Sequence, residues 1–187
     1  MFQEFALKFV RGDFENAHPD KGRFRHFVKT VIYRLVIDYQ RRQKRNRQNQ
    51  DLAEVAPDEI LSPTEQMETD FIQSWRSELL AHAWAALQAE EERTGKPYHT
   101  VLRLRADNPE LRSPDIAAAL TSRLGREIRP GNARVLVHRS RELFAQQLLD
   151  LVEDSLRDDS DDELENELIT LDLLAYCRPV LETRKKK

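Results

Sequence analysis

Two helices joined by a turn are predicted by residues 113–143, which read SPDIAAALTSRLGREIRPGNARVLVHRSREL. Ser113 offers a hydroxyl that can cap a helix, and Pro114 fits the first helical turn. Asp115 places a negative charge near the positive end of the helix dipole. Gly125 can adopt the left-handed backbone conformation that commonly ends a helix. We therefore expect one helix that ends just before this glycine and a second helix after a short turn.

The second helix is predicted to start near Asn132, which follows a Pro-Gly turn and can serve as its cap, and to continue through about Val152. Apolar residues at helical spacing give both helices an inward face. The inward positions are Ile116, Ala117, Leu120, Ala133, Leu136, Val137, Phe144, Leu148 and Leu151.

The outward arc of the second helix is basic, and its members are Asn132, Arg134, Val135, His138, Arg139 and Arg141. Guanidinium groups near the N-terminus of a helix can reach guanine in the major groove of DNA. An apolar side chain such as Val135 suits contact with a thymine methyl group. These six residues are candidate DNA contacts. An amphipathic helical hairpin with a solvated basic face fits the same pattern.

Other parts of the chain are also predicted to be helical. Apolar residues recur at helical spacing over residues 22–47 and 71–92, and a shorter helix is expected over residues 98–106. No strand-like alternation is present, and only 5 of the 187 residues are glycine. These features predict an all-α protein.

Charge is segregated along the chain, although the net charge is only −3. Residues 1–50 carry 12 basic and 5 acidic side chains, whereas residues 51–70 carry 7 acidic and no basic ones. The acidic segment also contains Pro57 and Pro63 and lacks helical periodicity. We therefore predict an acidic flexible linker at 48–69.

This linker divides the chain into a helical module at 1–47 and a second module at 70–156 that contains a helix-turn-helix. An acidic segment and a C-terminal helix are expected at 157–187. Leucines at helical spacing in this tail, from Leu164 to Leu174, indicate a helix that packs on the second module or on a regulator.

The first module holds a second basic patch. Nine basic residues lie between Arg23 and Arg47 with one acid, Asp38, and such a patch gives salt-dependent affinity for nucleic acid. Tyr33 lies opposite the apolar stripe, where its ring could stack on an unpaired base. The candidate contacts here are Arg23, Arg25, Lys29, Tyr33, Arg41, Arg42 and Arg45.

Catalytic and metal-binding patterns are absent from the sequence. The five histidines show no metal-ligand spacing, and the single Cys177 excludes an intramolecular disulfide and a site with several thiolates. No stretch of about 18 apolar residues occurs, so no membrane span is predicted. We expect a cytoplasmic protein that is not an enzyme and carries no metal or cofactor.

Two segments carry a family resemblance: GRFRHFVKTVIYRLVIDYQRR at residues 22–42 and GNARVLVHRSREL at residues 131–143. The first resembles the second region of bacterial RNA polymerase sigma factors of the extracytoplasmic-function group. The second resembles the recognition helix in the fourth region of the same family. Phe2-Gln3-Glu4-Phe5 is similar to a short family motif that precedes the first segment.

The resemblance implies a promoter-specific initiation factor that binds core RNA polymerase through its β′ clamp and β flap. The 23–47 helix would contact the minus-ten element, and the arc from Asn132 to Arg141 would contact the minus-thirty-five element. Gln3, Glu4 and Phe5 would contribute to polymerase binding. An anti-sigma factor is a further possible partner. Because the family carries more helices before this motif, we expect an N-terminally truncated member.

Two other functions fit the same residues. One is a stand-alone helix-turn-helix repressor or activator, which would need a dimer interface in the tail helix. The other is a truncated sigma-like interaction protein that titrates polymerase or a regulator without productive DNA binding. Binding to core polymerase separates the sigma factor and the titrating protein from the stand-alone regulator.

Overall fold

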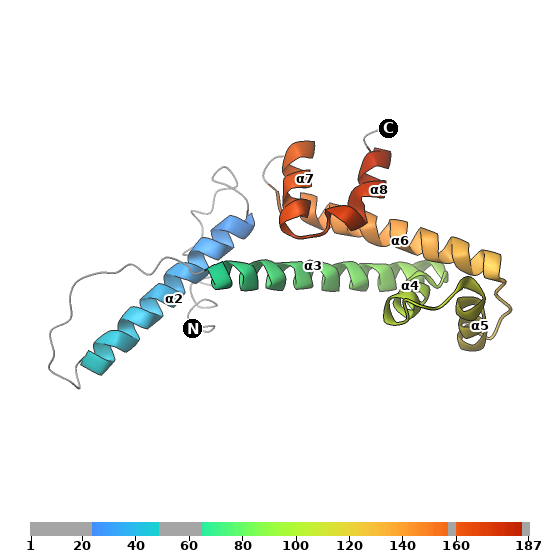
Figure 1. Ribbon diagram of the computed structural model, residues 1–187, viewed down its shortest axis with the longest axis horizontal. Helices are drawn as coiled ribbons and strands as arrows, with labels where there is room; N and C mark the ends of the chain where they lie inside the picture. Colours follow the sequence, from blue (N-terminus) through green and yellow to red (C-terminus); the bar gives the residue numbers. More distant parts are fainter. Residues whose placement is uncertain (1–23, 49–64, 157–159, 185–187) are drawn as a thin grey trace. The chain divides into compact units, whose positions relative to one another are not determined.

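The computed structural model describes residues 24–48, 65–156 and 160–184 (Figure 1). In these ranges the regular structure consists of seven helices without a strand, which confirms the predicted all-α class. None of these helices combines the length and apolar character needed to cross a membrane. The helices are α2 (Phe24–Gln48), α3 (Glu65–Thr94), α4 (Tyr98–Asp107), α5 (Ser113–Leu124), α6 (Pro130–Glu153), α7 (Asp161–Thr170) and α8 (Leu174–Arg184).

The chain divides into two compact units, Met1–Gln73 with Ser155–Asp159, and Ser74–Asp154 with Ser160–Lys187. Helix α3 begins at Glu65, so the last five residues of the predicted linker are helical. These residues, Glu-Gln-Met-Glu-Thr, include good helix formers and place acids near the helix N-terminus, where the dipole favours them. The remainder of the predicted linker after Gln48 lies outside the described residues.

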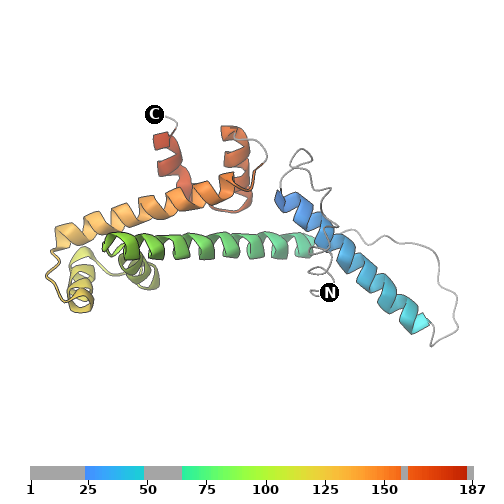
Figure 2. The same cartoon turned by 180° about the vertical axis from the view of Figure 1, so that it is seen from behind.

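Helix α6 is the centre of the second unit, because α4, α5, α7 and α8 all pack against it. Figures 1 and 2 show α4 and α5 on one side of α6 and the α7–α8 pair on the other. The core beneath α6 and α5 comprises Val101, Leu104, Ile116, Ala117, Leu120 and Ala133. The inward positions predicted for α5 are therefore confirmed.

The start of α5 differs from the prediction in its cap. Ser113 is the first helical residue, and the backbone N–H of Arg112 donates to Oδ2 of Asp115 at 3.1 Å. At the other end Gly125 has φ 64°, and its N–H donates to the carbonyl of Thr121 at 3.0 Å, as expected for a left-handed C-cap. The Thr121 hydroxyl accepts from the N–H of Ile128 at 2.9 Å, which fixes the loop between the two helices.

Helix α6 starts two residues before the predicted cap Asn132. Pro130 occupies the first turn and Arg129 is the N-cap. Proline fits this position because the N–H that it lacks would have no partner within the helix. The helix then continues to Glu153, close to the predicted end.

The tail forms two helices where one was predicted. Asp172, with φ 55°, lies in the turn between α7 and α8, and such a backbone conformation does not continue a helix. Leu164, Leu168 and Cys177 are buried, which confirms that the tail packs within its own unit. Arg184 of α8 bonds the carboxylates of Asp150 and Glu153 on α6 and thereby ties the end of the chain to the central helix.

Candidate nucleic-acid interface

The N-terminal half of α6 exposes one arc of side chains. All six predicted contacts on this helix are exposed, and Val135 keeps 48% of its surface accessible despite being apolar. The opposite side of the helix is buried through Ala133, Ser140 and Phe144. The Ser140 hydroxyl donates to the carbonyl of Leu136 at 2.8 Å, so a polar residue is accommodated on the buried side. The helical period therefore places the exposed residues, Asn132, Arg134, Val135, His138, Arg139 and Arg141, on one continuous surface.

An acid lies within this basic arc. Oε1 of Glu142 is 3.3 Å from Nε2 of His138, one helical turn earlier. Both side chains are largely exposed. Glu142 is not among the predicted contacts, although its spacing of four residues from His138 is the signal that predicts such an ion pair.

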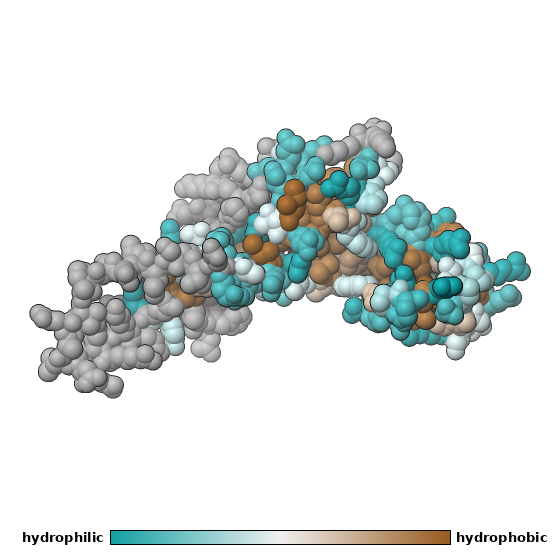
Figure 3. All heavy atoms as spheres, viewed as in Figure 1, coloured by the Kyte–Doolittle hydropathy of each residue, from teal (hydrophilic) through white to brown (hydrophobic). Residues whose placement is uncertain are grey.

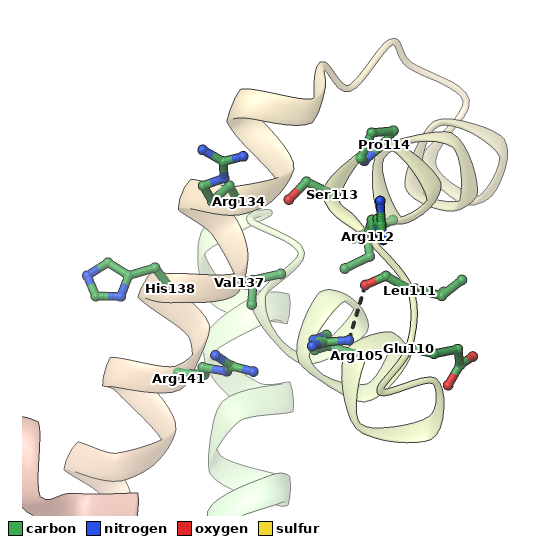
Figure 4. A pocket seen from close by; sticks show the side chains of 11 residues that line it. Arg105, Glu110, Leu111, Arg112, Ser113, Pro114, Arg134, Val137, His138 and Arg141 are labelled. Carbon is green, nitrogen blue, oxygen red and sulfur yellow. Dashed lines mark hydrogen bonds between the residues drawn. The ribbon is translucent and has the colours of Figure 1, made fainter.

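A cavity of about 610 Å³ lies beside the arc, between α6, the end of α4 and the start of α5. Figure 4 shows Arg141 directed toward the loop that precedes α5, whereas His138 points away from it. The lining of the cavity includes four arginines from three segments: Arg105, Arg112, Arg134 and Arg141.

These arginines have two different environments. Arg105 is committed to the fold, because its Nη1 donates to the carbonyls of Asn108 at 3.3 Å and Leu111 at 3.1 Å, and also to that of Pro109. Within the described parts of the chain, Arg112, Arg134 and Arg141 form no ion pair. Their charges are available to a ligand.

The N-terminus of α5 faces the same cavity through Ser113 and Pro114. A helix N-terminus favours an anion because of its unpaired N–H groups and its dipole. Asp115 already places a carboxylate at this N-terminus, and Glu110 adds an acid to the cavity lining. The arginines outnumber Glu110 in the lining, so the cavity is net positive and suits an anion such as a phosphate group. The cavity could not be predicted from the sequence, because its lining comes from segments that only the fold brings together.

The candidates on α2 have more varied surroundings. Arg41 and Arg42 are exposed, whereas Arg25 is buried with only 4% of its surface accessible. Lys29 forms an ion pair with Glu68 of α3. Arg23, the side chain of Arg45, and the predicted polymerase contacts Gln3, Glu4 and Phe5 lie outside the described residues.

Tyr33 is buried, with 8% of its surface accessible, although its position opposite the apolar stripe predicted an exposed ring that could stack on a base. The Lys29 ammonium lies 5.6 Å from the centre of its ring, and burial raises the pKa of the Tyr33 phenol. The ring therefore packs beside the Lys29–Glu68 ion pair. This arrangement depends on Glu68, which lies 39 residues after Lys29 in the sequence. The periodicity of α2 alone does not reveal such a partner.

Within the described residues, no group of three or more His, Cys, Asp or Glu side chains is placed to hold a metal ion. The chain matches no protein-family model, no curated protein and no solved structure. The class defined by the described residues is an all-helical protein with a basic helix face beside an arginine-lined cavity. Its function is inferred from these features.

Proposed function

We propose that this protein is a sigma-type initiation factor, which binds core RNA polymerase and directs it to promoters. In this proposal α5 and α6 form a helix-turn-helix motif, and the N-terminal half of α6 enters the major groove of the minus-thirty-five element. The observation that carries the DNA-binding part of the proposal is the exposed arc of α6, where three arginines, a histidine, an asparagine and an apolar side chain share one surface.

Each group on the arc has a defined role in the proposal. Arg134 and Arg139 bind guanine O6 and N7 through two hydrogen bonds each, which is the commonest specific contact in the major groove. Asn132 binds a base edge or a phosphate near the helix N-terminus. Val135 contacts a thymine methyl group.

Arg112 and Arg141 bind backbone phosphates from the cavity beside α6. Phosphate contacts position the helix without reading sequence, and they make affinity depend on salt.

The sigma-type assignment rests on the resemblance of two segments, 22–42 and 131–143, which occur in the family's order. The exposed pair Arg41 and Arg42 near the end of α2 supports a role for that helix in holding the minus-ten element. We propose that α2 acts chiefly on the melted strand and α6 on the duplex.

Selection of DNA duplexes on the full-length chain tests the DNA-binding part. We expect enrichment of a short motif, whose affinity is then measured by fluorescence anisotropy at fixed salt. Replacing Arg134 and Arg139 by alanine should lower the affinity for the enriched duplex at least tenfold, since each paired contact to guanine is worth about 1–3 kcal/mol. Arg123→Ala, at an exposed position of α5 outside the arc, is the matched control and should bind normally. Equal affinity for random and enriched duplexes would contradict the assignment.

A stand-alone helix-turn-helix regulator is the second candidate. The burial of Arg25 and Tyr33 favours it, because these α2 side chains are engaged in packing and not offered to DNA. Co-purification with core RNA polymerase separates the two candidates. A sigma-type factor should retain purified core enzyme. A stand-alone regulator should bind the selected duplex but should not retain core enzyme.

A further inference from the structure

A second hollow, of about 790 Å³, lies between α6 and α8. Most of its lining is apolar, and we call this part the floor: Leu143 and Ala145 on α6 and Ala175, Tyr176, Pro179 and Val180 on α8. Tyr98 of α4 and the polar Gln146 and Thr183 also line the hollow. Figure 3 shows apolar atoms gathered where α7 and α8 join α6, whereas hydrophilic atoms dominate at the end where α6 begins. We call this hollow the α6–α8 groove.

Tyr176 offers the groove both an apolar ring and a hydroxyl group. Its ring packs edge-on against Phe144, with 5.8 Å between the ring centres, and 40% of the residue still faces solvent. Burial raises the pKa of its phenol to about 12, so the hydroxyl stays protonated and can donate a hydrogen bond. Pro179 lacks an N–H, so the carbonyl of Ala175 receives no helical hydrogen bond from it and can accept one from a ligand.

The groove has a charged edge. His138, Arg139 and Arg141 line the end that faces the N-terminal half of α6. Glu142 contributes one acid at this edge, and its carboxylate lies beside His138. The floor is therefore apolar and the edge carries a net positive charge.

We infer that the α6–α8 groove binds an acidic amphipathic helix of a protein partner. A groove between two helices takes a third helix through apolar residues on one side, spaced three or four positions apart. The arginines at the edge select acidic residues on the flanks of that helix. The apolar floor disfavours a nucleic acid as occupant, because phosphates would be placed against carbon atoms.

Occupation of the groove excludes DNA from α6. His138 and Arg141 line both the α6–α8 groove and the cavity beside α5, and Arg139 belongs to the arc that we assign to DNA. A partner that engages these cations removes them from the duplex. This part of the inference rests on the proposed function, whereas binding of the helix itself does not.

A displayed library tests the groove on the full-length chain. The library contains peptides of about 18 residues, or about five helical turns, with leucine fixed on one face and all other positions randomised. We expect enriched peptides to be acidic. Ala175→Glu, at an exposed position that lines the groove, should lower the affinity for the enriched peptides by about tenfold or more, since like charges repel across an interface.

Arg178→Glu is the matched control, because it adds an acid at an exposed position of α8 that does not line the groove. It should leave binding of the enriched peptides within about twofold, and circular dichroism should show both variants folded. Enrichment of basic or neutral peptides, no enrichment, or equal binding to the Ala175→Glu variant would overturn the proposal.

Competition with DNA separates the groove from the proposed function. An enriched acidic peptide should displace the selected duplex from the chain. Simultaneous binding of peptide and duplex would overturn the exclusion. If the peptide binds and no duplex does, the DNA-binding proposal fails while the groove stands.

Discussion

Glu142 lies one helical turn beyond His138 on α6, with 3.3 Å between Oε1 of the carboxylate and Nε2 of the imidazole. This contact places a negative charge within the basic arc that we assign to DNA. A carboxylate near backbone phosphates opposes binding of any duplex.

Glu142→Gln should therefore raise affinity for selected and scrambled duplexes alike, by about two- to fivefold, as expected for an exposed charge worth less than about 1 kcal/mol. Fluorescence anisotropy with both duplexes at the same salt concentration measures this. Glu182→Gln, an exposed acid on α8, serves as the control and should change neither affinity. A lower affinity for the scrambled duplex would contradict the assigned position of Glu142.

Arg112→Ala and Arg134→Ala should have different signatures. Arg112 lines the cavity assigned to a phosphate, so its loss should lower the affinity for all duplex sequences similarly. It should also reduce the slope of log affinity against log salt by about 1. Arg134 is assigned to a base, so its loss should relax specificity at one base pair by about 1–3 kcal/mol. Titrations of single-base variants of the selected duplex at several salt concentrations distinguish the two. Identical behaviour of both variants would contradict the division of roles.

Replacing Arg41 and Arg42 by alanine should chiefly reduce open-complex formation, because these exposed cations are assigned to the melted strand. Permanganate reactivity of unpaired thymines at the minus-ten element measures melting directly. Binding of the closed duplex should change little, since the proposal assigns most of that contact to α6. Arg34→Ala, also exposed on α2, provides the comparison and should melt normally. Normal melting by the double variant would remove α2 from the proposed mechanism.

The buried thiol of Cys177 makes stability depend on alkaline pH. Burial raises its pKa from 9.0 to about 11. Below pH 9 the thiol is protonated in both states, so its contribution to stability is fully present. As pH rises from 9 to 11 the unfolded chain loses the proton first, and stability falls by about 2–3 kcal/mol.

Chemical denaturation of the wild type and of Cys177→Ala across this pH range isolates the effect, because all other titrating groups are shared. Between low and high pH in this range, the free energy of unfolding of the wild type should fall by about 2–3 kcal/mol relative to that of Cys177→Ala. A difference that stays constant between pH 9 and 11 would mean that the thiol is not buried in solution.

The sequence predicted α5 and α6 closely because local signals act at both ends. Gly125 can adopt the left-handed conformation that ends α5, and the ring of Pro130 fixes φ near the helical value at the start of α6. Apolar periodicity separates buried positions such as Leu120 from the exposed arc. The exposure of the six α6 candidates follows from this periodicity. Their role in binding DNA stays a prediction.

Features that depend on distant residues could not be predicted in this way. Tyr33 is buried beside a lysine whose ion-pair partner is Glu68, and no local pattern in α2 encodes that partner. The cavity beside α5 and the α6–α8 groove also combine separate segments. The break between α7 and α8 depends on a positive φ at Asp172, which is uncommon for a residue other than glycine.

Run-off transcription tests the central claim most directly. The full-length chain is added to purified core RNA polymerase on a template that carries the selected motif, together with the variant in which Arg134 and Arg139 are replaced by alanine. The account predicts a specific transcript with the wild type, loss of most of that transcript with the double variant, and normal transcript with Arg123→Ala. Absence of any specific transcript, with retained binding to the duplex, would contradict the sigma-type assignment and favour the stand-alone regulator.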